Sequence, residues 1–229
     1  MHGVKLLLQR QLGVDKMALT VSDLMGRARQ RYNAVGDDFF SDQMLRDAIF
    51  DAQSDLAKVG WVIEKTLETT SVADQREYTY PDNTLAIKEV RYDSDKLCKV
   101  TLRDDPKTSN DDPTGTPADY AIWDDVIFVY PTPDTTGDTI QIKVYSYPQD
   151  ITSNTDSIEV PQEYREDIIN YLNFIMATKD QNFTLADRLL SRWETALERA
   201  RRQRQRRQHG DDFYTVRDCY FSSSNIPQT

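Results

Sequence analysis

The pattern of apolar and polar residues predicts a pair of helices near the start of the chain. The residues that recur there at helical spacing are Val21, Leu24, Met25, Ala28 and Tyr32. Thr20 is a suitable N-cap, with Asp23 three residues later. A second helix is predicted to begin after Ser41 and to end at Gly60. Its apolar stripe comprises Leu45, Ala48, Ile49, Ala52 and Leu56.

Between Trp61 and Tyr147 the pattern changes to that of β-strands, with β-branched and aromatic residues interrupted by Pro, Gly, Asn and Asp. Strands are predicted at residues 62–69, 77–80, 86–92, 99–102, 120–123, 126–130 and 139–145. Asp124 and Asp125 are predicted to form a two-residue hairpin turn. Residues 103–117 are polar and lack periodic apolar positions, which predicts an exposed loop.

Helical spacing returns after Pro161, a residue type that is favoured at the first position of a helix. The first stripe comprises Tyr164, Ile168, Tyr171, Leu172, Ile175 and Met176. After a break near residues 180–182, the second comprises Phe183, Ala186, Leu189, Leu190, Trp193, Leu197 and Ala200. The helical pattern is predicted to stop at Gly210, and residues 211–229 are interpreted as a tail.

These elements predict an α+β fold. The N- and C-terminal helices are expected to form one helical bundle, with an inserted antiparallel β-sheet or sandwich unit and an extended C-terminal tail. The predicted divisions are a flexible N-terminal arm (1–19), a helical bundle domain (20–60 and 158–208), a β-rich insert domain (61–157) and a C-terminal docking tail (209–229). We expect neither an export signal nor a membrane span, because the longest apolar runs are short. Met17 is an alternative start, in which case residues 1–16 lie outside the native protein or form a flexible arm.

The charge of the chain is unevenly distributed. The whole chain has a net charge of −10, yet seven arginines and only two acidic residues lie between Arg192 and Arg207. The rest of the chain therefore has a net charge of −15, which should repel nucleic acid. The two cysteines, Cys98 and Cys219, lie far apart in the sequence and are expected to be free thiols, as in a reducing compartment.

No residues in the sequence form a recognisable catalytic or cofactor-binding motif. His2 and His209 both lie in predicted terminal segments, and Gly115 lacks the Lys-Ser/Thr that a phosphate-binding loop requires. Five adjacent aspartate pairs occur at turn signals, where we expect them to cap helices and solubilise loops rather than to bind metal. We therefore expect no catalytic residues, no cofactor and no metal.

The arginine-rich segment is the clearest functional candidate. It could bind nucleic-acid phosphates, or dock on an acidic protein surface through paired Arg–carboxylate contacts. Alternatively, the segment has no binding role and is a solvated helix end whose cations offset the helix dipole. Protein docking is favoured because aromatic residues, which serve as anchors in interfaces, follow the arginines. The candidate docking residues are Arg199, Arg201, Arg202, Arg204, Arg206, Arg207, Phe213, Tyr214, Tyr220 and Phe221.

An ordered set of short motifs between Thr20 and Ala200 resembles the head-tail adaptor (connector) proteins of tailed bacteriophages. The first helix matches the pattern T-x-x-[DE]-L-[IM]-x-R-x-R, and the second matches [FW]-[ST]-D-x-x-L-x-x-x-[IL]-x-x-A-Q. The segments that carry the resemblance are residues 20–29, 40–42, 45–53, 87–92, 99–101, 114–117 with Tyr120, 127–134 and 158–164.

The resemblance implies a virion structural protein of the neck, assembled in the host cytoplasm, and not an enzyme. Its expected partners are eleven further copies in a dodecameric ring, the portal protein, and a tail nozzle, stopper or other tail protein. Genomic DNA would pass through the lumen without specific binding. Two alternatives are a different neck or tail-completion ring protein, such as a stopper, and a nucleic-acid-binding module that uses the arginine-rich helix.

Overall fold

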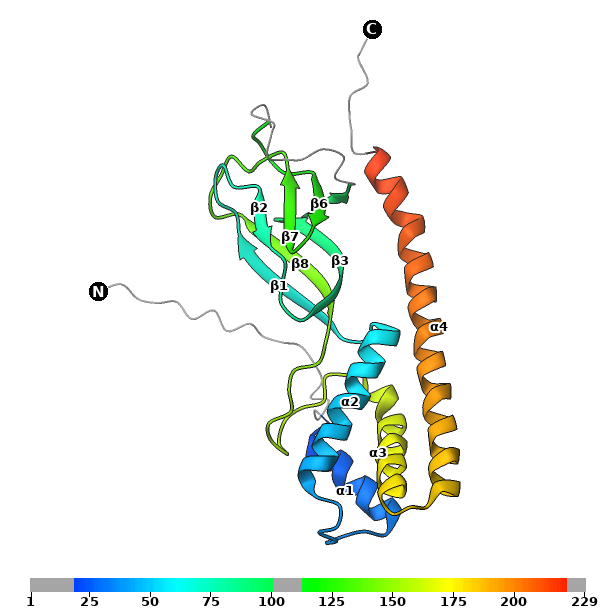
Figure 1. Ribbon diagram of the computed structural model, residues 1–229. Helices are drawn as coiled ribbons and strands as arrows, with labels where there is room; N and C mark the ends of the chain where they lie inside the picture. Colours follow the sequence, from blue (N-terminus) through cyan, green and yellow to red (C-terminus); the bar gives the residue numbers. More distant parts are fainter. Residues whose placement is uncertain (1–18, 101–112, 222–229) are drawn as a thin grey trace, which may run out of the picture.

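The computed structural model describes residues 19–100 and 113–221, without the side chains of residues 208–221. The predicted N-terminal arm, apart from Leu19, and most of the predicted loop 103–117 therefore lie outside the described residues. The helices are α1 (Val21–Tyr32), α2 (Asp42–Gly60), the 3-10 turn η1 (Gln162–Tyr164), α3 (Arg165–Lys179) and α4 (Phe183–Phe221). The strands are β1 (Glu64–Thr70), β2 (Glu77–Thr79), β3 (Thr84–Tyr92), β4 (Asp95–Lys96), β5 (Cys98–Lys99), β6 (Asp119–Trp123), β7 (Val126–Tyr130) and β8 (Thr139–Ser146). The predicted α+β class is confirmed (Figure 1).

Both N-terminal helices begin at the predicted caps. The Thr20 side chain accepts a hydrogen bond from the Asp23 N–H, and the Asp23 carboxylate accepts one from the Thr20 N–H, which completes a capping box. The Ser41 hydroxyl accepts a hydrogen bond from the Met44 N–H at 3.4 Å. Helix α2 ends at Gly60 as predicted, but its left-handed cap is Trp61, with φ of 50°.

The four helices share one hydrophobic core, to which each contributes buried residues. Helix α3 lies against α1 and α4, and α2 lies against α3 and α4. Helices α2 and α4 approach so closely at Gly60 that a Cβ atom there would lie 2.7 Å from Ala200 Cβ. Gly60 is therefore required by a close contact between helices, in addition to its position near a helix end.

Residues 64–146 form a β unit with a core of its own. One sheet has the strand order β1-β8-β3-β4 and the other β2-β7-β6-β5. The pairs are antiparallel except β5 with β6, which are parallel. Buried residues of both sheets form one cluster, so the sheets pack face to face. The short strand β4 was not predicted, and β5 ends at Lys99 rather than continuing through Val100 as expected.

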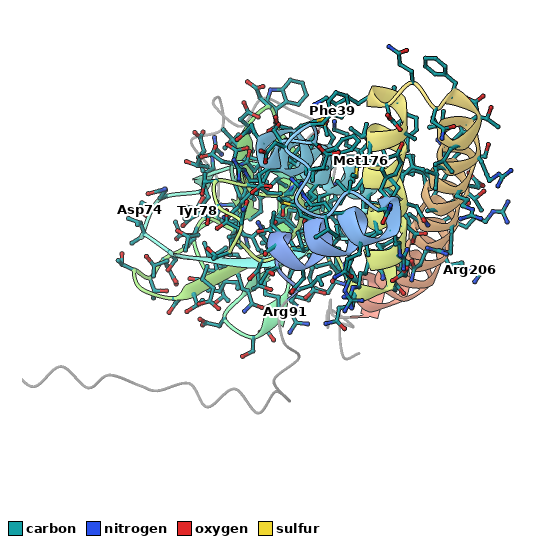
Figure 2. All side chains as sticks on the ribbon, turned by 90° about the horizontal axis from the view of Figure 1, so that it is seen from below. Phe39, Asp74, Tyr78, Arg91, Met176 and Arg206 are labelled. Carbon is teal, nitrogen blue, oxygen red and sulfur yellow. The ribbon has the colours of Figure 1, made fainter. Side chains whose placement is uncertain are left out.

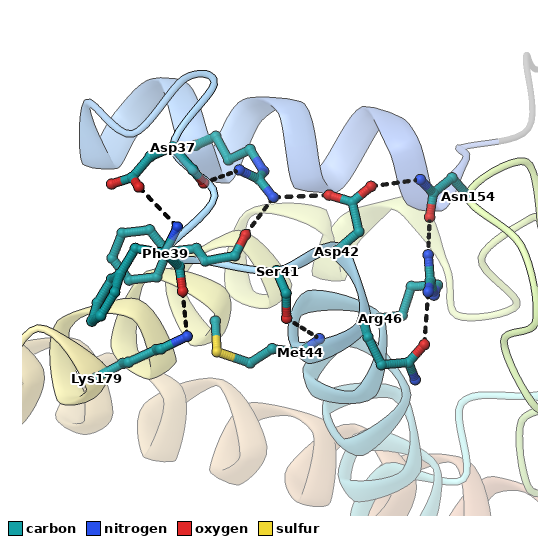
Figure 3. A network of polar contacts seen from close by, with 11 residues as sticks. Asp37, Phe39, Ser41, Asp42, Met44, Arg46, Asn154 and Lys179 are labelled. Carbon is teal, nitrogen blue, oxygen red and sulfur yellow. Dashed lines mark hydrogen bonds and ion pairs between the residues drawn. The ribbon is translucent and has the colours of Figure 1, made fainter.

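A polar network fixes the turn between α1 and α2 (Figure 3). The Arg29 guanidinium donates to the main-chain oxygens of Asp37 (2.9 Å) and Phe40 (2.5 Å) and to the Asp42 carboxylate (2.8 Å). Asn154 donates to the second Asp42 oxygen at 3.0 Å. The segment that returns from the β unit is thereby bonded to the start of α2.

Helix α4 is longer than the sequence pattern predicts. Its backbone passes through Gly210, the expected end, and stays helical to Phe221, so the prediction that residues 211–221 are an extended tail is wrong. A single glycine costs a helix only about 1 kcal/mol, which its neighbours can offset. Residues 222–229, the rest of the predicted tail, lie outside the described residues.

The prediction of two free thiols is also wrong, because Cys98 of β5 is disulfide-bonded. Cys219 is the chain's only other cysteine, and its side chain lies outside the described residues. The inference of a reducing compartment from free thiols therefore loses its basis.

Glu89 of β3 is the centre of an ion cluster, and it predicts how stability changes with pH. Its carboxylate lies 2.5 Å from Arg91 Nε and 2.9 Å from Lys143 Nζ, and its side chain is 15% exposed. Burial raises the pKa of Glu89, but the hydrogen bonds and charges of Arg91 and Lys143 outweigh this and lower it from 4.5 to about 2. A carboxylate whose pKa is lower in the folded state stabilises the fold above its unfolded pKa, and this stabilisation is lost as the pH falls toward 2.

We therefore expect Glu89→Gln to lower the free energy of unfolding by about 1–2 kcal/mol at pH 7, after allowance for solvent screening. The difference from the parent protein should shrink steadily between pH 4.5 and pH 2. Urea unfolding at pH 7 and pH 3 measures it, with Glu68→Gln, an exposed carboxylate of the same sheet, as the control. An equal loss at both pH values would show that charge is not the cause.

Candidate docking surface on helix α4

The arginine-rich segment lies in the middle of α4, where the helix leaves the shared core. Ala200 is the last buried residue of α4 among those whose side chains the structure describes. Beyond it the helix continues past the helical core and alongside the β unit (Figure 1). The arginines are therefore held on a rigid element between the two parts of the molecule.

Three of the predicted docking residues lie on one face of α4. Arg199, Arg202 and Arg206 follow one another at steps of three and four residues, which places them on a common stripe. They line an open groove of about 710 Å³, together with Glu163, Ser191, Glu194, Thr195, Glu198 and Gln203. Figure 2 shows Arg206 at the periphery of the molecule, beside α4.

Nearby carboxylates neutralise only part of the positive charge of this stripe. Glu198 lies 3.1 Å from Arg202 and 3.8 Å from Arg201, and Arg202 remains 70% exposed. Arg199 forms an ion pair with Asp167 of α3. The pKa of the Asp167 carboxyl is raised, because the effect of its burial exceeds the lowering effect of Arg199. Arg206 has no ion pair within the part of the chain that the structure describes. The stripe can therefore donate guanidinium hydrogen bonds to carboxylates of a partner.

Two other predicted docking residues point toward the β unit instead. The Arg204 guanidinium lies 3.6 Å from the centre of the Trp61 ring, which stacks on Tyr145 of β8 at 5.0 Å. Arg207 lies 3.4 Å from the carboxylate of Glu64, at the start of β1. These contacts connect α4 to the end of α2 and to the first sheet. Sequence reasoning missed Trp61 and Tyr145, because the contact joins distant segments.

The four predicted aromatic docking residues are not tested by this geometry. Phe213, Tyr214, Tyr220 and Phe221 belong to the helical backbone of α4, but their side chains lie outside the described residues. Sequence reasoning also missed the groove residues Glu163 and Gln203. Gln203 accepts a hydrogen bond from the Tyr164 hydroxyl at 2.7 Å, and no local pattern marks this pair.

The sequence model of the SU10 adaptor protein family matches residues 19–218. The chain belongs to this family. It is a family of phage head-tail adaptors, so the resemblance predicted from the sequence is confirmed. The match extends beyond Ala200, where the resemblance was expected to end, and includes all of the arginines described above. A search of curated proteins found no match.

Within the residues that the structure describes, no three His, Cys, Asp or Glu side chains are grouped so that they could hold a metal ion. Over the same residues, no helix combines the length and the apolar character needed to cross a membrane.

Proposed function

We propose that this protein is a virion structural adaptor of the phage neck. In this proposal twelve copies form a ring beneath the portal, extend the DNA channel and provide the platform to which the tail attaches. The match to the SU10 adaptor protein family over residues 19–218 is the observation that carries it. The proposed role is structural, and no catalytic residue is assigned.

The outward stripe of α4 is the proposed contact with the portal. Arg199, Arg202 and Arg206 supply positive charge on a rigid helix, which favours approach to an acidic groove and paired hydrogen bonds with its carboxylates. The aromatic residues that follow in α4 would add apolar anchors. Arg204 and Arg207 have a different proposed role, since their contacts with Trp61 and Glu64 hold α4 in position.

The acidic remainder of the chain fits a protein that borders a DNA channel. The net charge of −10 is reached despite the seven arginines between Arg192 and Arg207. A predominantly acidic surface repels phosphates and lets DNA move past without specific binding. This supports the ring as a conduit. The sequence also left open a stopper or another neck ring protein. The family match supports the role of an adaptor over these.

The decisive experiment is native mass spectrometry of the protein alone and with its portal protein. We expect large ring complexes to form when portal is present. The paired variant Arg202→Gln/Arg206→Gln should weaken portal binding at least about tenfold, roughly 1.4 kcal/mol. The matched control is Arg188→Gln/Arg192→Gln, which removes two exposed charges from the first half of the same helix.

Equal binding by both variants would contradict the proposed contact, and a protein that never joins portal would contradict the adaptor role. A separate titration with duplex DNA tests the nucleic-acid alternative. Tight binding that weakens steeply with salt, and that the Arg202→Gln/Arg206→Gln variant loses, would favour that alternative instead.

A further inference from the structure

Strand β1 has a long edge that pairs with no other strand described in the structure. It is the outermost strand of the sheet β1-β8-β3-β4, and it pairs with β8 along all seven of its residues without a bulge. It contains no proline. Soluble proteins usually shorten, twist or cover such an edge, because it can pair with a strand of another molecule.

The pairing register identifies the backbone groups that point to this edge. The Ile63 carbonyl accepts a hydrogen bond from the Ser146 N–H at 3.0 Å, and the Ser71 N–H donates to the Asp138 carbonyl at 2.8 Å. In an antiparallel ladder every second residue bonds to the same neighbour. The odd-numbered residues of β1 therefore bond to β8. The residues whose N–H and C=O groups point outward are Glu64, Thr66, Glu68 and Thr70.

Two of the charged side chains of β1 are already paired within the molecule. Charged residues often protect an edge strand, because another strand would have to cover them. Here Lys65 Nζ lies 3.1 Å from the carboxylate of Glu159. Glu64 is paired with Lys88 at 3.2 Å and with Arg207 at 3.4 Å. These two side chains therefore oppose a further strand less than free charges would.

Leu67 is an exposed apolar residue at the centre of β1. It lies opposite Ile142 of β8, which is buried in the core of the β unit. Leu67 shares that face of the sheet but is 37% exposed, since β1 is the outermost strand. A further strand would cover its side chain. The most favourable neighbour is a strand that places an apolar residue directly opposite Leu67.

We propose that this edge binds the same strand of a second copy, antiparallel, about a two-fold axis at Leu67. Only the even-numbered residues have outward hydrogen-bonding groups, so the register must place even opposite even and odd opposite odd. With the axis at Leu67, all seven residues of β1 are paired. The opposed residues of the two copies are then Glu64 with Thr70, Lys65 with Thr69, Thr66 with Glu68, and Leu67 with Leu67.

Charge repulsion selects this register from the others that the backbone allows. An axis at Glu64, Lys65 or Glu68 would place two like charges directly opposite each other. An axis at Thr66 would place Glu64 of each copy opposite Glu68 of the other. Like charges in these positions destabilise a sheet. An axis at Thr69 avoids the repulsion but pairs only the end of β1. The central register alone combines full pairing with no opposed like charges.

The antiparallel arrangement keeps the helical parts of the two copies apart. Strand β1 follows α2 and begins at the end of the β unit that is nearer the helical core (Figure 1). A two-fold axis across β1 therefore places the helical core of the second copy at the opposite end. Such a contact uses the same edge of both copies and closes after two. It cannot build the proposed ring by repetition, so the pair is a state of the protein without portal and does not rest on the proposed function.

Disulfide cross-linking of Leu67→Cys in the absence of portal, with copper–phenanthroline as oxidant, tests the proposal. In this register the Cα atoms of the two residues 67 lie about 4.5 Å apart, as in other non-hydrogen-bonded pairs, and a disulfide can join them. The matched control is Thr69→Cys on the same face, because its two copies lie about 13 Å apart along the strands. We expect at least about tenfold more covalent dimer from Leu67→Cys, above the yield of the parent protein.

A proline at position 66 separates pairing at the edge from pairing with β8. The Thr66 N–H points outward, so its loss removes no bond to β8, and proline is tolerated at such positions of edge strands. In the Leu67→Cys background, Thr66→Pro should reduce the yield of covalent dimer at least about fivefold, because it removes a hydrogen bond to the second copy. The urea concentration at the midpoint of unfolding should stay nearly unchanged.

The yield of Leu67→Cys dimer should rise with protein concentration, since an interface of this size is weak. Equal yields from the Leu67 and Thr69 variants would overturn the proposal, because they would indicate random collision. A Leu67→Cys protein that gives no dimer at any concentration would also overturn it, as would a yield that the proline leaves unchanged. A higher yield at Thr69 than at Leu67 would show that the two copies pair in another register, which contradicts the axis at Leu67.

Discussion

Replacement of Trp193 by alanine is expected to lower the free energy of unfolding by about 3–5 kcal/mol. Trp193 is 3% exposed, and its ring lies 4.8 Å from that of Tyr171 of α3. It belongs to the core that all four helices share, so its removal leaves a cavity that rigid helices cannot fill. Urea unfolding followed by circular dichroism at a helical wavelength measures the loss.

The matched control is Trp123→Ala, because Trp123 precedes the β6–β7 turn and is 64% exposed. We expect it to change the free energy of unfolding by less than about 0.5 kcal/mol. Hydrogen exchange then tests the predicted domain division. Trp193→Ala should raise exchange in α2, α3 and α4 and leave β6 and β7 unaffected, since the β unit has its own core. Equal increases in the strands would show that both cores unfold together.

The elements that the sequence predicts well are those fixed by neighbouring residues. The capping box of Thr20 and Asp23 and the Ser41 cap involve contacts across only three positions. The β6–β7 hairpin is similar, because Asp124, the first of its two turn residues, takes a positive φ of 53°, as the first position of the favoured two-residue turns requires. Such contacts depend on local chemistry alone, so a single sequence reveals them.

The features that the sequence did not reveal depend on distant contacts. The close approach of Gly60 to Ala200 joins residues far apart in the chain, and a glycine near a helix end has a simpler local explanation. The disulfide at Cys98 is likewise not marked by any local pattern. In contrast, the sequence predicted a contact that does not form at Phe183. Its place on an apolar stripe predicted burial, yet its side chain is exposed.

The candidate site was predictable as a segment but not as a surface. Composition located the arginines, and their spacing alone could not assign them to partners. The structure divides them: Arg199, Arg202 and Arg206 line a groove, while Arg204 contacts Trp61 and Arg207 contacts Glu64. Which face of a long helix stays free depends on where the other elements lie beside it.

Gly60→Ala is expected to lower the free energy of unfolding by about 1–3 kcal/mol, although alanine is the better helix former. The new methyl group would lie 2.7 Å from Ala200 Cβ and 2.9 Å from Val62 Cγ1, so α2 and α4 must separate. The control is Gly26→Ala in α1, where the new Cβ meets no atom within 4 Å apart from its chain neighbours and the adjacent backbone of its own helix. That substitution should raise the free energy of unfolding by up to about 1 kcal/mol.

The double variant Gly60→Ala/Ala200→Gly tests whether this contact is the cause. Ala200→Gly alone should lower the free energy of unfolding by about 1 kcal/mol, because glycine is a poorer helix former than alanine. In the double variant it also removes the Ala200 methyl group that the new methyl group at position 60 would meet. We therefore expect the double variant to be more stable than the sum of the single losses predicts, by roughly 1 kcal/mol or more. Strictly additive losses would show that the contact with Val62 Cγ1, 2.9 Å from the new methyl group, causes the loss rather than the approach of α4. If the coupling is found, the position of α4, and with it the direction of the arginine stripe, is set by a contact between two small residues.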